Sequence, residues 1–319
     1  MKTDLEAAAE LLSSAQQVLV MGHRNPEGDC IASTVAMGLI CDRLGLAVTL
    51  YNDDPVPENL LAMPGSDRLV DKVETGTTFD LAVVVDCGAL DRIGRGTSLL
   101  EGLPILNLDH HVTNTFFGHV NLVRPEASSA TEVVHELGEQ LGLAMDPSLA
   151  EVIYCGVLTD TGSFHYSNAT AKAFHLAGDL VSRGVDPWAV SSYLYENQPI
   201  ARLRLLAAAL QTLEVGPPGT YASIVLSEET FRLTGAGSDL TDGLINYPRS
   251  LRGVEIAVQF REIERHHYKI SLRSKGAIDV GALASRFGGG GHRNASGLEL
   301  RGTLEEVKVQ LYTAILDLC

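Results

Sequence analysis

One tetrapeptide of this 319-residue sequence joins a carboxylate to two imidazoles: Leu108-Asp109-His110-His111. It closes an apolar run, residues 103–108, that has the composition of a buried strand. The ends of such strands are where α/β proteins place their reactive groups. Carboxylate oxygens and imidazole nitrogens are the ligands that hard and borderline divalent cations prefer. The tetrapeptide therefore predicts a metal site at one edge of a sheet.

Three other apolar runs also lead into acids or histidines. The groups that follow them are His23, Glu27 and Asp29 after residues 18–22, Asp86 after residues 81–85, and Asp160 after residues 152–158. We expect all of these groups to meet at one sheet edge. Two cations about 3.5–4 Å apart can clamp the attacking and leaving oxygens of a phosphoryl transfer. Asp86, which stands alone at its strand end, suits the carboxylate that bridges such a pair.

Simpler explanations exist for parts of this pattern. Asp29 could cap the helix that begins near Cys30, and His23 could be a histidine with local hydrogen bonds. These explanations do not account for the other three segments. A serine-type triad would need a nucleophile elbow such as G-x-S-x-G, which the sequence lacks. The expected ligands include no cysteine, which favours manganese or magnesium over a structural zinc ion.

The composition is that of a globular protein, with 45% hydrophobic and 20% charged residues. The net charge of −16 disfavours binding of long or duplex nucleic acid through phosphate neutralisation. Residues 249–293 have the opposite charge balance, because this stretch contains nine Lys and Arg residues and only four acids. This basic stretch suits a short anionic ligand, although a solvated strand face of mixed charge is the alternative.

The cysteines and the apolar runs indicate the cellular setting. Five scattered cysteines, an odd number, predict reduced thiols in a cytoplasm and no disulfide framework. No apolar run reaches about 18 residues, so we expect no membrane span and no membrane partner.

The elements that must position the ligands alternate between strands and helices up to about Trp188. This rhythm predicts an α/β domain with a mostly parallel sheet flanked by helices. Strands are expected near residues 17–22, 46–51, 81–86 and 104–109, and helices near 4–15, 30–44, 130–142, 148–158, 171–183 and 187–195. Ser128 and Ser129 provide the start signal of the helix near 130–142.

The length predicts two domains. We expect a catalytic domain over residues 1–195, a helical linker over 196–212 and a smaller α+β domain over 213–319. The breaker cluster Gly216-Pro217-Pro218-Gly219 follows the linker. The second domain is expected to have a mixed or antiparallel sheet with strands near 221–226, 254–262 and 267–273, a hairpin turn at Glu264-Arg265, and helices near 279–286 and 303–317.

Four segments together resemble the motifs of the DHH phosphoesterases, a family named for its Asp-His-His sequence. They are Asp29 with Ile31-Ala32-Ser33, Val85-Asp86-Cys87, Asn107-Leu108-Asp109-His110-His111, and Gly156-Val157-Leu158-Thr159-Asp160-Thr161-Gly162-Ser163-Phe164. Their order and spacing fit the family, and the resemblance covers nearly the whole chain. It implies two bound divalent cations, Mn²⁺ foremost, with Mg²⁺ or Co²⁺ as alternatives.

The resemblance also implies a role for each matching residue. One cation would bind His23, Glu27 and Asp86, and the other would bind Asp29, Asp86, His110 and Asp160. His111 would contact the scissile phosphate or give a proton to the leaving group, and Asp109 would orient its neighbouring histidine. Glu27 departs from the aspartate that is usual in the family. We expect weaker binding of the first cation or a change of ion; a solvated Glu27 with one cation bound is the alternative.

A glycine-rich segment, residues 287–297, is the second candidate site. Consecutive glycines let backbone amides approach a phosphate closely and adopt positive φ, although a flexible loop is the commoner explanation. The segment resembles the GGGH signature of the DHH-associated C-terminal domain, and residues 270–274 resemble that domain's strand motif. The resemblance implies substrate contacts from Arg273, Gly289, Gly290, Gly291, His292 and Arg293.

The two-domain pattern resembles the nano-RNase and 3′,5′-bisphosphate nucleotidase branch of the family. It implies a cytoplasmic, homodimeric phosphohydrolase that degrades short oligonucleotides and dephosphorylates 3′-phosphoadenosine 5′-phosphate. One alternative is a cyclic-dinucleotide phosphodiesterase, which would share both domains. Another is a nucleotide-binding sensor with decayed catalysis, which only Glu27 favours. A RecJ-type exonuclease would carry an added nucleic-acid module, and a manganese pyrophosphatase would lack the glycine run at 288–291.

Overall fold

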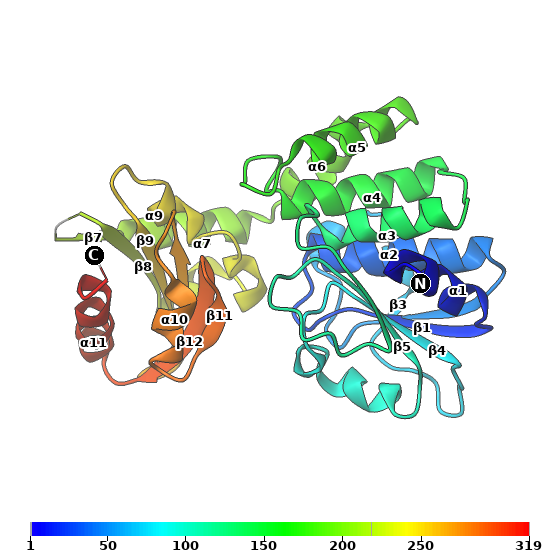
Figure 1. The fold of residues 1–319 in the computed structure, drawn as a ribbon. Coiled ribbons are helices and arrows are strands. Elements are labelled where there is room, and N and C mark those ends of the chain that lie inside the picture. Colours follow the sequence, from blue (N-terminus) through cyan, green and yellow to red (C-terminus); the bar gives the residue numbers. More distant parts are fainter. Residues whose placement is uncertain (1, 218, 319) are drawn as a thin grey trace. The chain divides into compact units, whose positions relative to one another are not determined.

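The computed structural model describes residues 2–217 and 219–318, and the chain divides into two compact units, Met1–Asn197 and Gln198–Cys319 (Figure 1). Each unit contains one six-stranded sheet and its own buried core. The predicted α/β class, with a smaller α+β part after it, is confirmed. None of the helices described is both long enough and apolar enough to cross a bilayer.

The first sheet is parallel throughout, with the strand order β3-β2-β1-β4-β5-β6. Its strands are β1 (Gln17–Met21), β2 (Ala47–Tyr51), β3 (Leu69–Val70), β4 (Leu81–Val85), β5 (Ile105–Asp109) and β6 (Val120–Val123). The chain leaves β1 toward β2 on one side and later enters β4 on the other side. Ligands of open parallel sheets bind outside the carboxyl ends of the strands at such a switch point, here between β1 and β4.

The four predicted strands of this sheet form within one residue of their expected bounds. All five residues of β4 are apolar and buried, as a strand covered on both faces requires. Strands β3 and β6 were not predicted. β3 has only two residues, and β6 carries Asn121 and has Leu122 as its one buried residue, so neither gives an apolar run.

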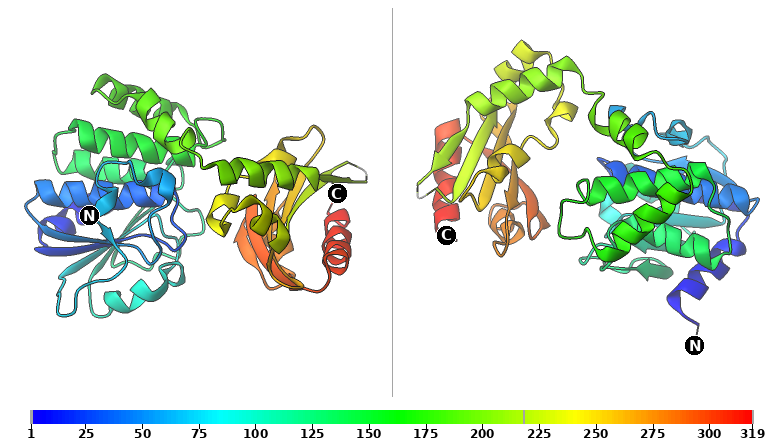
Figure 2. Two further views of the ribbon diagram at one scale, coloured as in Figure 1. Left: turned by 180° about the vertical axis from the view of Figure 1, so that it is seen from behind. Right: turned by 90° about the horizontal axis from the view of Figure 1, so that it is seen from above.

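Helices cover one face of this sheet in two layers (Figures 1 and 2). α1 (Asp4–Ser13), α2 (Gly28–Arg43) and α3 (Ala130–Gln140) form the inner layer, and α4 (Pro147–Asp160) packs on α2 and α3. α5 (Ala171–Ser182) contacts α4, and α6 (Pro187–Tyr195) follows it. The other face packs against the short 3-10 segments η3 (Leu90–Arg92) and η4 (Gly94–Leu100).

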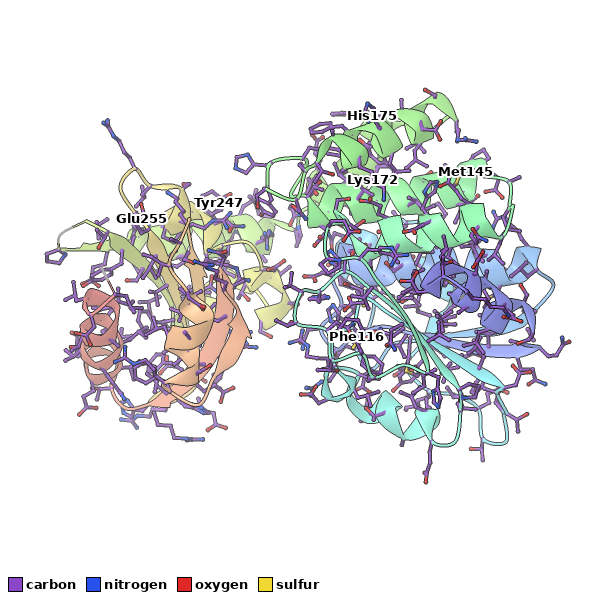
Figure 3. All side chains as sticks on the ribbon, in the orientation of Figure 1. Phe116, Met145, Lys172, His175, Tyr247 and Glu255 are labelled. Atoms are coloured by element: carbon purple, nitrogen blue, oxygen red, sulfur yellow. The ribbon has the colours of Figure 1, made fainter. Side chains whose placement is uncertain are left out.

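The start of α3 is held by polar contacts. The Ser129 side chain accepts a hydrogen bond from the Glu132 amide at 3.1 Å, as the predicted start signal implies. The buried Glu132 carboxylate accepts from the Ser128 amide at 2.8 Å and lies 2.9 Å from Lys172 Nζ. Lys172 belongs to α5 and is labelled in Figure 3. This arrangement fixes the loop that leads from β6 to α3.

Two glycines allow α4 to pack closely on α2 and α3. A Cβ at Gly28 would collide with the Thr159 side chain, and a Cβ at Gly156 would collide with Thr131 Oγ1. The same Cβ at Gly156 would also lie 2.9 Å from Asp29 Oδ1. The close approach therefore brings the first turn of α2 to the last turns of α4.

The second unit has a mixed sheet in the order β11-β12-β10-β9-β8-β7, in which only β8 and β9 pair in parallel. Its strands are β7 (Glu214–Gly216), β8 (Tyr221–Leu226), β9 (Ile256–Glu264), β10 (His267–Ser274), β11 (Gly290–His292) and β12 (Ala295–Arg301). Its helices are α7 (Ile200–Gln211), α8 (Glu228–Thr234), α9 (Asn246–Ser250), α10 (Val280–Ser285) and α11 (Leu304–Leu316), with the 3-10 turn η5 (Ser238–Thr241).

Some boundaries of the second unit differ from those expected. α7 begins at Ile200 and not at residue 196, because Pro199 occupies its N-cap in an extended conformation. The hairpin turn lies at Arg265-His266, one residue later than expected, with His266 at φ +61°. β11 and β12 were missed, because the glycine-rich sequence before Leu298 lacks the β-branched and aromatic residues typical of strands.

We predict that Gly156→Ala lowers the free energy of unfolding by about 1–3 kcal/mol, because the added methyl group overpacks the contact of α4 with Thr131 of α3 and Asp29 of α2. Gly178→Ala is the matched control, since Gly178 lies in α5 and a Cβ there would meet no other atom within 4 Å. That control should be neutral or stabilising by up to about 1 kcal/mol. Urea unfolding measures both changes, and equal stabilities of the two variants would contradict the close packing.

Candidate metal centre

Five elements bring carboxylates and imidazoles together at the switch point of the first sheet. His23 follows β1, Asp29 lies in the first turn of α2, Asp86 follows β4, His110 follows β5, and Asp160 ends α4. His110 Nε2 lies 3.9 Å from Asp29 Oδ2 and 3.7 Å from an oxygen of both Asp86 and Asp160. His23 Nε2 lies 3.4 Å from Asp86 Oδ2. The structure thus gathers these five predicted ligands in one place.

Asp86 is the least satisfied member of this cluster. Its φ of +50° is left-handed, a conformation that is costly for a residue other than glycine. Its side chain is 2% exposed, and neither carboxylate oxygen accepts a hydrogen bond within the described parts of the chain. A buried carboxylate without hydrogen-bond donors is unfavourable unless a cation neutralises it. Asp86 is therefore placed as a cation ligand would be.

His23 and His110 share an orientation that favours metal binding. His23 Nδ1 donates to the Arg24 carbonyl at 2.8 Å, and His110 Nδ1 donates to the Ala127 carbonyl at 3.3 Å. In both rings the hydrogen bond at Nδ1 selects the tautomer whose Nε2 carries a lone pair directed at the carboxylates. Backbone carbonyls commonly hold metal-binding imidazoles in this way.

His111 is held differently. Its Nδ1 lies 2.7 Å from Asp109 Oδ1, and the fully buried Asp109 also accepts from Asn114 Nδ2 at 2.6 Å. Burial opposes both charges, but the contact between the two groups lowers the pKa of Asp109 and raises the pKa of His111. Asp109 therefore fixes the ring of His111. Asn114 was missed, because a lone asparagine in a turn has no distinctive sequence signal.

Asp29 has partners in α3, and it does not cap its own helix. The N-cap of α2 is Glu27, which makes no capping hydrogen bond. Asp29 instead accepts from the Ala130 amide at 2.6 Å and the Thr131 amide at 3.0 Å, and also from the Thr131 hydroxyl. These amides belong to the first turn of α3, so Asp29 joins the starts of two helices.

The carboxylates repel one another. Burial and the neighbouring Asp86 raise the pKa of Asp29 to about 6, and burial and Asp29 raise the pKa of Asp160 well above its usual range. Burial opposes the charge of His110, but Asp29, Asp86 and Asp160 together raise its pKa to about 9. A divalent cation relieves such repulsion. The donors therefore fit a divalent cation in both charge and type.

The described residues contain three groups of donor atoms that could each hold an ion: His23, Cys30 and Asp86; Asp86, His110 and His111; and Asp29, His110 and Asp160. Asp86 belongs to two of them. Glu27 belongs to none of them; its side chain is 65% exposed, and its Oε1 lies 3.7 Å from His23 Nε2. Cys30 was not expected among the ligands; its place directly after Asp29, in the first turn of α2, was the available signal.

The second half of the glycine run at 288–291 lies in a strand, β11. Gly290 pairs with Gly297 in β12, and Gly291 pairs with Ser296. A Cβ at Gly289 would lie 2.6 Å from the Leu298 Cβ, and Gly291 has a φ of +141°. Both positions therefore require glycine for close packing at this edge of the sheet.

The charged residues near this strand make local contacts. Arg293 Nη2 donates to the Ala277 carbonyl at 2.8 Å, and Arg273 Nη1 donates to the Leu272 carbonyl at 3.0 Å. The backbone of His292 pairs with Ala295, but its side chain lies outside the described part of the structure. The predicted substrate contacts from this segment thus stay predictions.

The chain matches the family model of the DHH family, N-terminal domain, over residues 17–157, and that of the DHHA1 domain over residues 231–317. The protein therefore contains a DHH domain followed by a DHHA1 domain, the two domains of the phosphoesterases that it resembles in sequence.

The similarity to known proteins extends over nearly the whole chain. It is 29% identical to the bifunctional oligoribonuclease and PAP phosphatase NrnA of Thermus thermophilus, over 93% of this chain and 89% of that protein. It is 27% identical to the cyclic-di-AMP phosphodiesterase PdeA of Listeria monocytogenes, over 97% of this chain but 49% of that protein. The crystal structure of an exopolyphosphatase-related protein from Bacteroides fragilis has a TM-score of 0.92 at 28% identity, and the match covers 98% of this chain and 95% of that chain.

We predict that Mn²⁺ raises the melting temperature of the protein and that Asp86→Asn abolishes this rise. Binding at a hundredfold excess over Kd stabilises a folded protein by about 2.7 kcal/mol. Asparagine keeps the size of Asp86 and tolerates left-handed φ, so the variant removes mainly the charge. Asp91→Asn, at an exposed aspartate in η3, is the control and should keep the full rise. An undiminished rise in Asp86→Asn would contradict the site.

Proposed function

We propose that this protein is a manganese-dependent phosphohydrolase. It degrades short oligonucleotides to mononucleotides and removes the 3′-phosphate of 3′-phosphoadenosine 5′-phosphate. The observation that carries the proposal is the similarity to the Thermus thermophilus relative, whose name gives both activities and whose length is matched almost from end to end. The buried cluster of carboxylates and imidazoles in the first unit supports the same chemistry.

Two cations are proposed at this cluster. One is assigned to His23, Glu27 and Asp86, and the other to Asp29, Asp86, His110 and Asp160. Asp86 would contribute to both positions in this assignment, which is supported by its two buried oxygens without hydrogen-bond donors among the described residues. When bound, such cations lower the pKa of a water molecule and neutralise charge on the phosphoryl oxygens.

His111 and Asp109 are proposed to act on the substrate side of the site. Asp109 accepts from Nδ1 of His111 and so turns Nε2 of the same ring away from itself. Through Nε2 the ring can contact the scissile phosphate or give a proton to the leaving oxygen. Asn114 holds the second oxygen of Asp109, which keeps the carboxylate and therefore the imidazole in place.

The second unit is proposed to bind the rest of the substrate. Its contacts are assigned to Arg273, Gly289, Gly290, Gly291, His292 and Arg293. The excess of basic residues over 249–293 suits a short anionic ligand, whereas the net charge of −16 opposes binding of a long strand. Residues 1–195 are then the catalytic domain, 196–212 the linker and 213–319 the substrate domain of a cytoplasmic homodimer.

Hydrolysis of a cyclic dinucleotide is the second candidate function. This function is favoured by the relative named a cyclic-di-AMP phosphodiesterase. The similarity to that protein covers 97% of the present chain. The chain spans about half of that protein, however. The linear substrates are therefore the first choice.

With Mn²⁺, we expect the purified protein to convert 5′-pApA to AMP and 3′-phosphoadenosine 5′-phosphate to AMP. Asp109→Asn should lower kcat by about 10–100-fold, because the ring of His111 loses its carboxylate partner, and it should keep the thermal stabilisation by Mn²⁺. Asp91→Asn should match the wild type. Turnover of cyclic di-AMP alone would favour the second candidate, and no turnover of any of the three substrates would contradict a phosphohydrolase.

A further inference from the structure

We propose that Cys30 is a ligand of the cation beside His23 and Asp86, and that this position therefore prefers Zn²⁺ or Co²⁺ to Mn²⁺. The inference rests on the proposed function in one respect, since both require a cation at Asp86. It adds a thiolate to a site for which the sequence predicted only oxygen and nitrogen ligands. Activation by manganese then reflects the second position, around His110.

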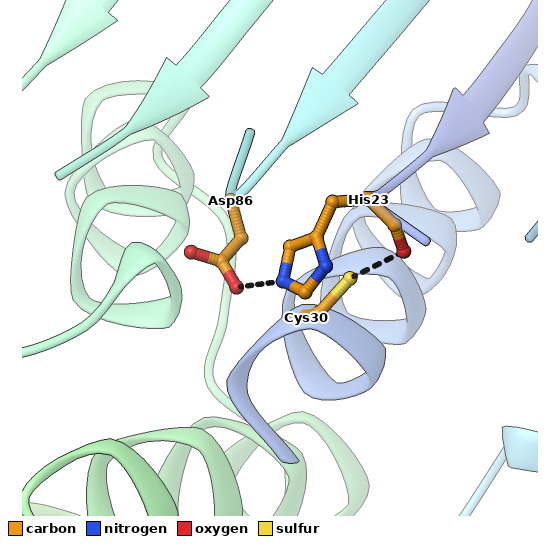
Figure 4. A group of neighbouring side chains, drawn as sticks. All are labelled: His23, Cys30 and Asp86. Atoms are coloured by element: carbon orange, nitrogen blue, oxygen red, sulfur yellow. Dashed lines mark hydrogen bonds and ion pairs between the residues drawn. The ribbon is translucent and has the colours of Figure 1, made fainter. Parts of the chain in front are cut away.

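The geometry places the sulfur of Cys30 within the site. Sγ, one ring nitrogen of His23 and one oxygen of Asp86 all lie within 4.8 Å of one another. Figure 4 shows the three side chains converging from the ends of β1 and β4 and the first turn of α2. All three residues are buried, with Cys30 fully inaccessible to solvent. Three donors at this spacing can surround one ion.

The sulfur of Cys30 makes only long hydrogen-bond contacts within the protein. Sγ lies 3.9 Å from the His23 carbonyl and 4.0 Å from Asn52 Nδ2, both at the long limit for hydrogen bonds to sulfur. A Cβ at Gly22 would collide with Sγ, so only a glycine at that position leaves room for the sulfur. The end of β1 is thus shaped around this thiol.

The Asp86 carboxylate gives independent evidence for a ligand at this point. Both of its oxygens are buried and accept no hydrogen bond from a described residue, and one of them faces His23 at 3.4 Å. Cys41 offers a comparison within the same helix. It is equally buried but belongs to no group of metal-type donors in the described chain. Burial of a thiol in α2 therefore does not by itself create a site.

A thiolate changes which ion is preferred. Sulfur is a soft ligand that selects zinc and related ions, whereas sets of carboxylates and water suit manganese and magnesium. On binding, the thiol proton leaves to solvent, a sulfur–metal bond forms, and no group is oxidised or reduced. Glu27, which is exposed but lies 3.7 Å from His23, remains able to add a fourth donor.

The test is a titration of the metal-free, reduced protein with Co²⁺, without substrate. A thiolate bound to Co²⁺ gives a charge-transfer band in the near ultraviolet, separate from the weaker visible bands of the ion. We expect the band in the wild type and in Cys41→Ala, and its complete loss in Cys30→Ala with the visible bands retained. Circular dichroism checks that both variants are folded, and Cys30→Ser replaces Cys30→Ala if the latter is not.

A second measurement uses the wild type alone. In mild denaturant, Zn²⁺ should protect Cys30 from alkylation more strongly than it protects Cys41, which gains only the protection due to stabilisation of the fold; mass spectrometry measures both. Visible bands without the near-ultraviolet band, or a band that persists in Cys30→Ala, would overturn the assignment of Cys30 and leave the proposed function intact. Absence of any Co²⁺ binding by calorimetry would overturn both.

Discussion

The first unit depends on one electrostatic constraint: several carboxylates are buried together at the switch point of a parallel sheet. Asp86 is held with left-handed φ and without hydrogen-bond donors from the described residues, while burial and like charge raise the pKa of Asp29 and Asp160. Such an arrangement is costly in an isolated chain and becomes favourable when cations bind. Groups held in such unfavourable conformations and surroundings cluster at functional sites of proteins.

The surrounding fold is built to hold these charges close. The strand order reverses between β1 and β4, so His23 and Asp86 emerge side by side. Gly156 lets α4 approach Asp29, and the first amides of α3 bind the same carboxylate. Backbone carbonyls turn the imidazoles of His23 and His110 toward the acids. Each contact restricts the position of a proposed metal ligand, which is the usual basis of a preorganised site.

Much of this could be predicted from the sequence, because the strands of a parallel sheet are apolar runs and their ends are marked by acids and histidines. β4 and Asp86 show this directly. β6 and β11 could not be predicted, since Asn121 and the glycines near 290 give no strand signal. The contacts of Asp29 with α3, of Asn114 with Asp109, and of Cys30 with the site depend on tertiary packing, which local patterns do not encode.

The most direct test of this account is a crystal structure of the protein grown with Mn²⁺, with anomalous difference maps recorded at the manganese edge. For crystals of metal-free protein given Mn²⁺ in excess and no other metal, the account predicts two peaks beside Asp86, one near His23 and the other near His110. Maps with no peak at Asp86 from well-ordered crystals, or with manganese bound only at remote surface acids, would contradict it.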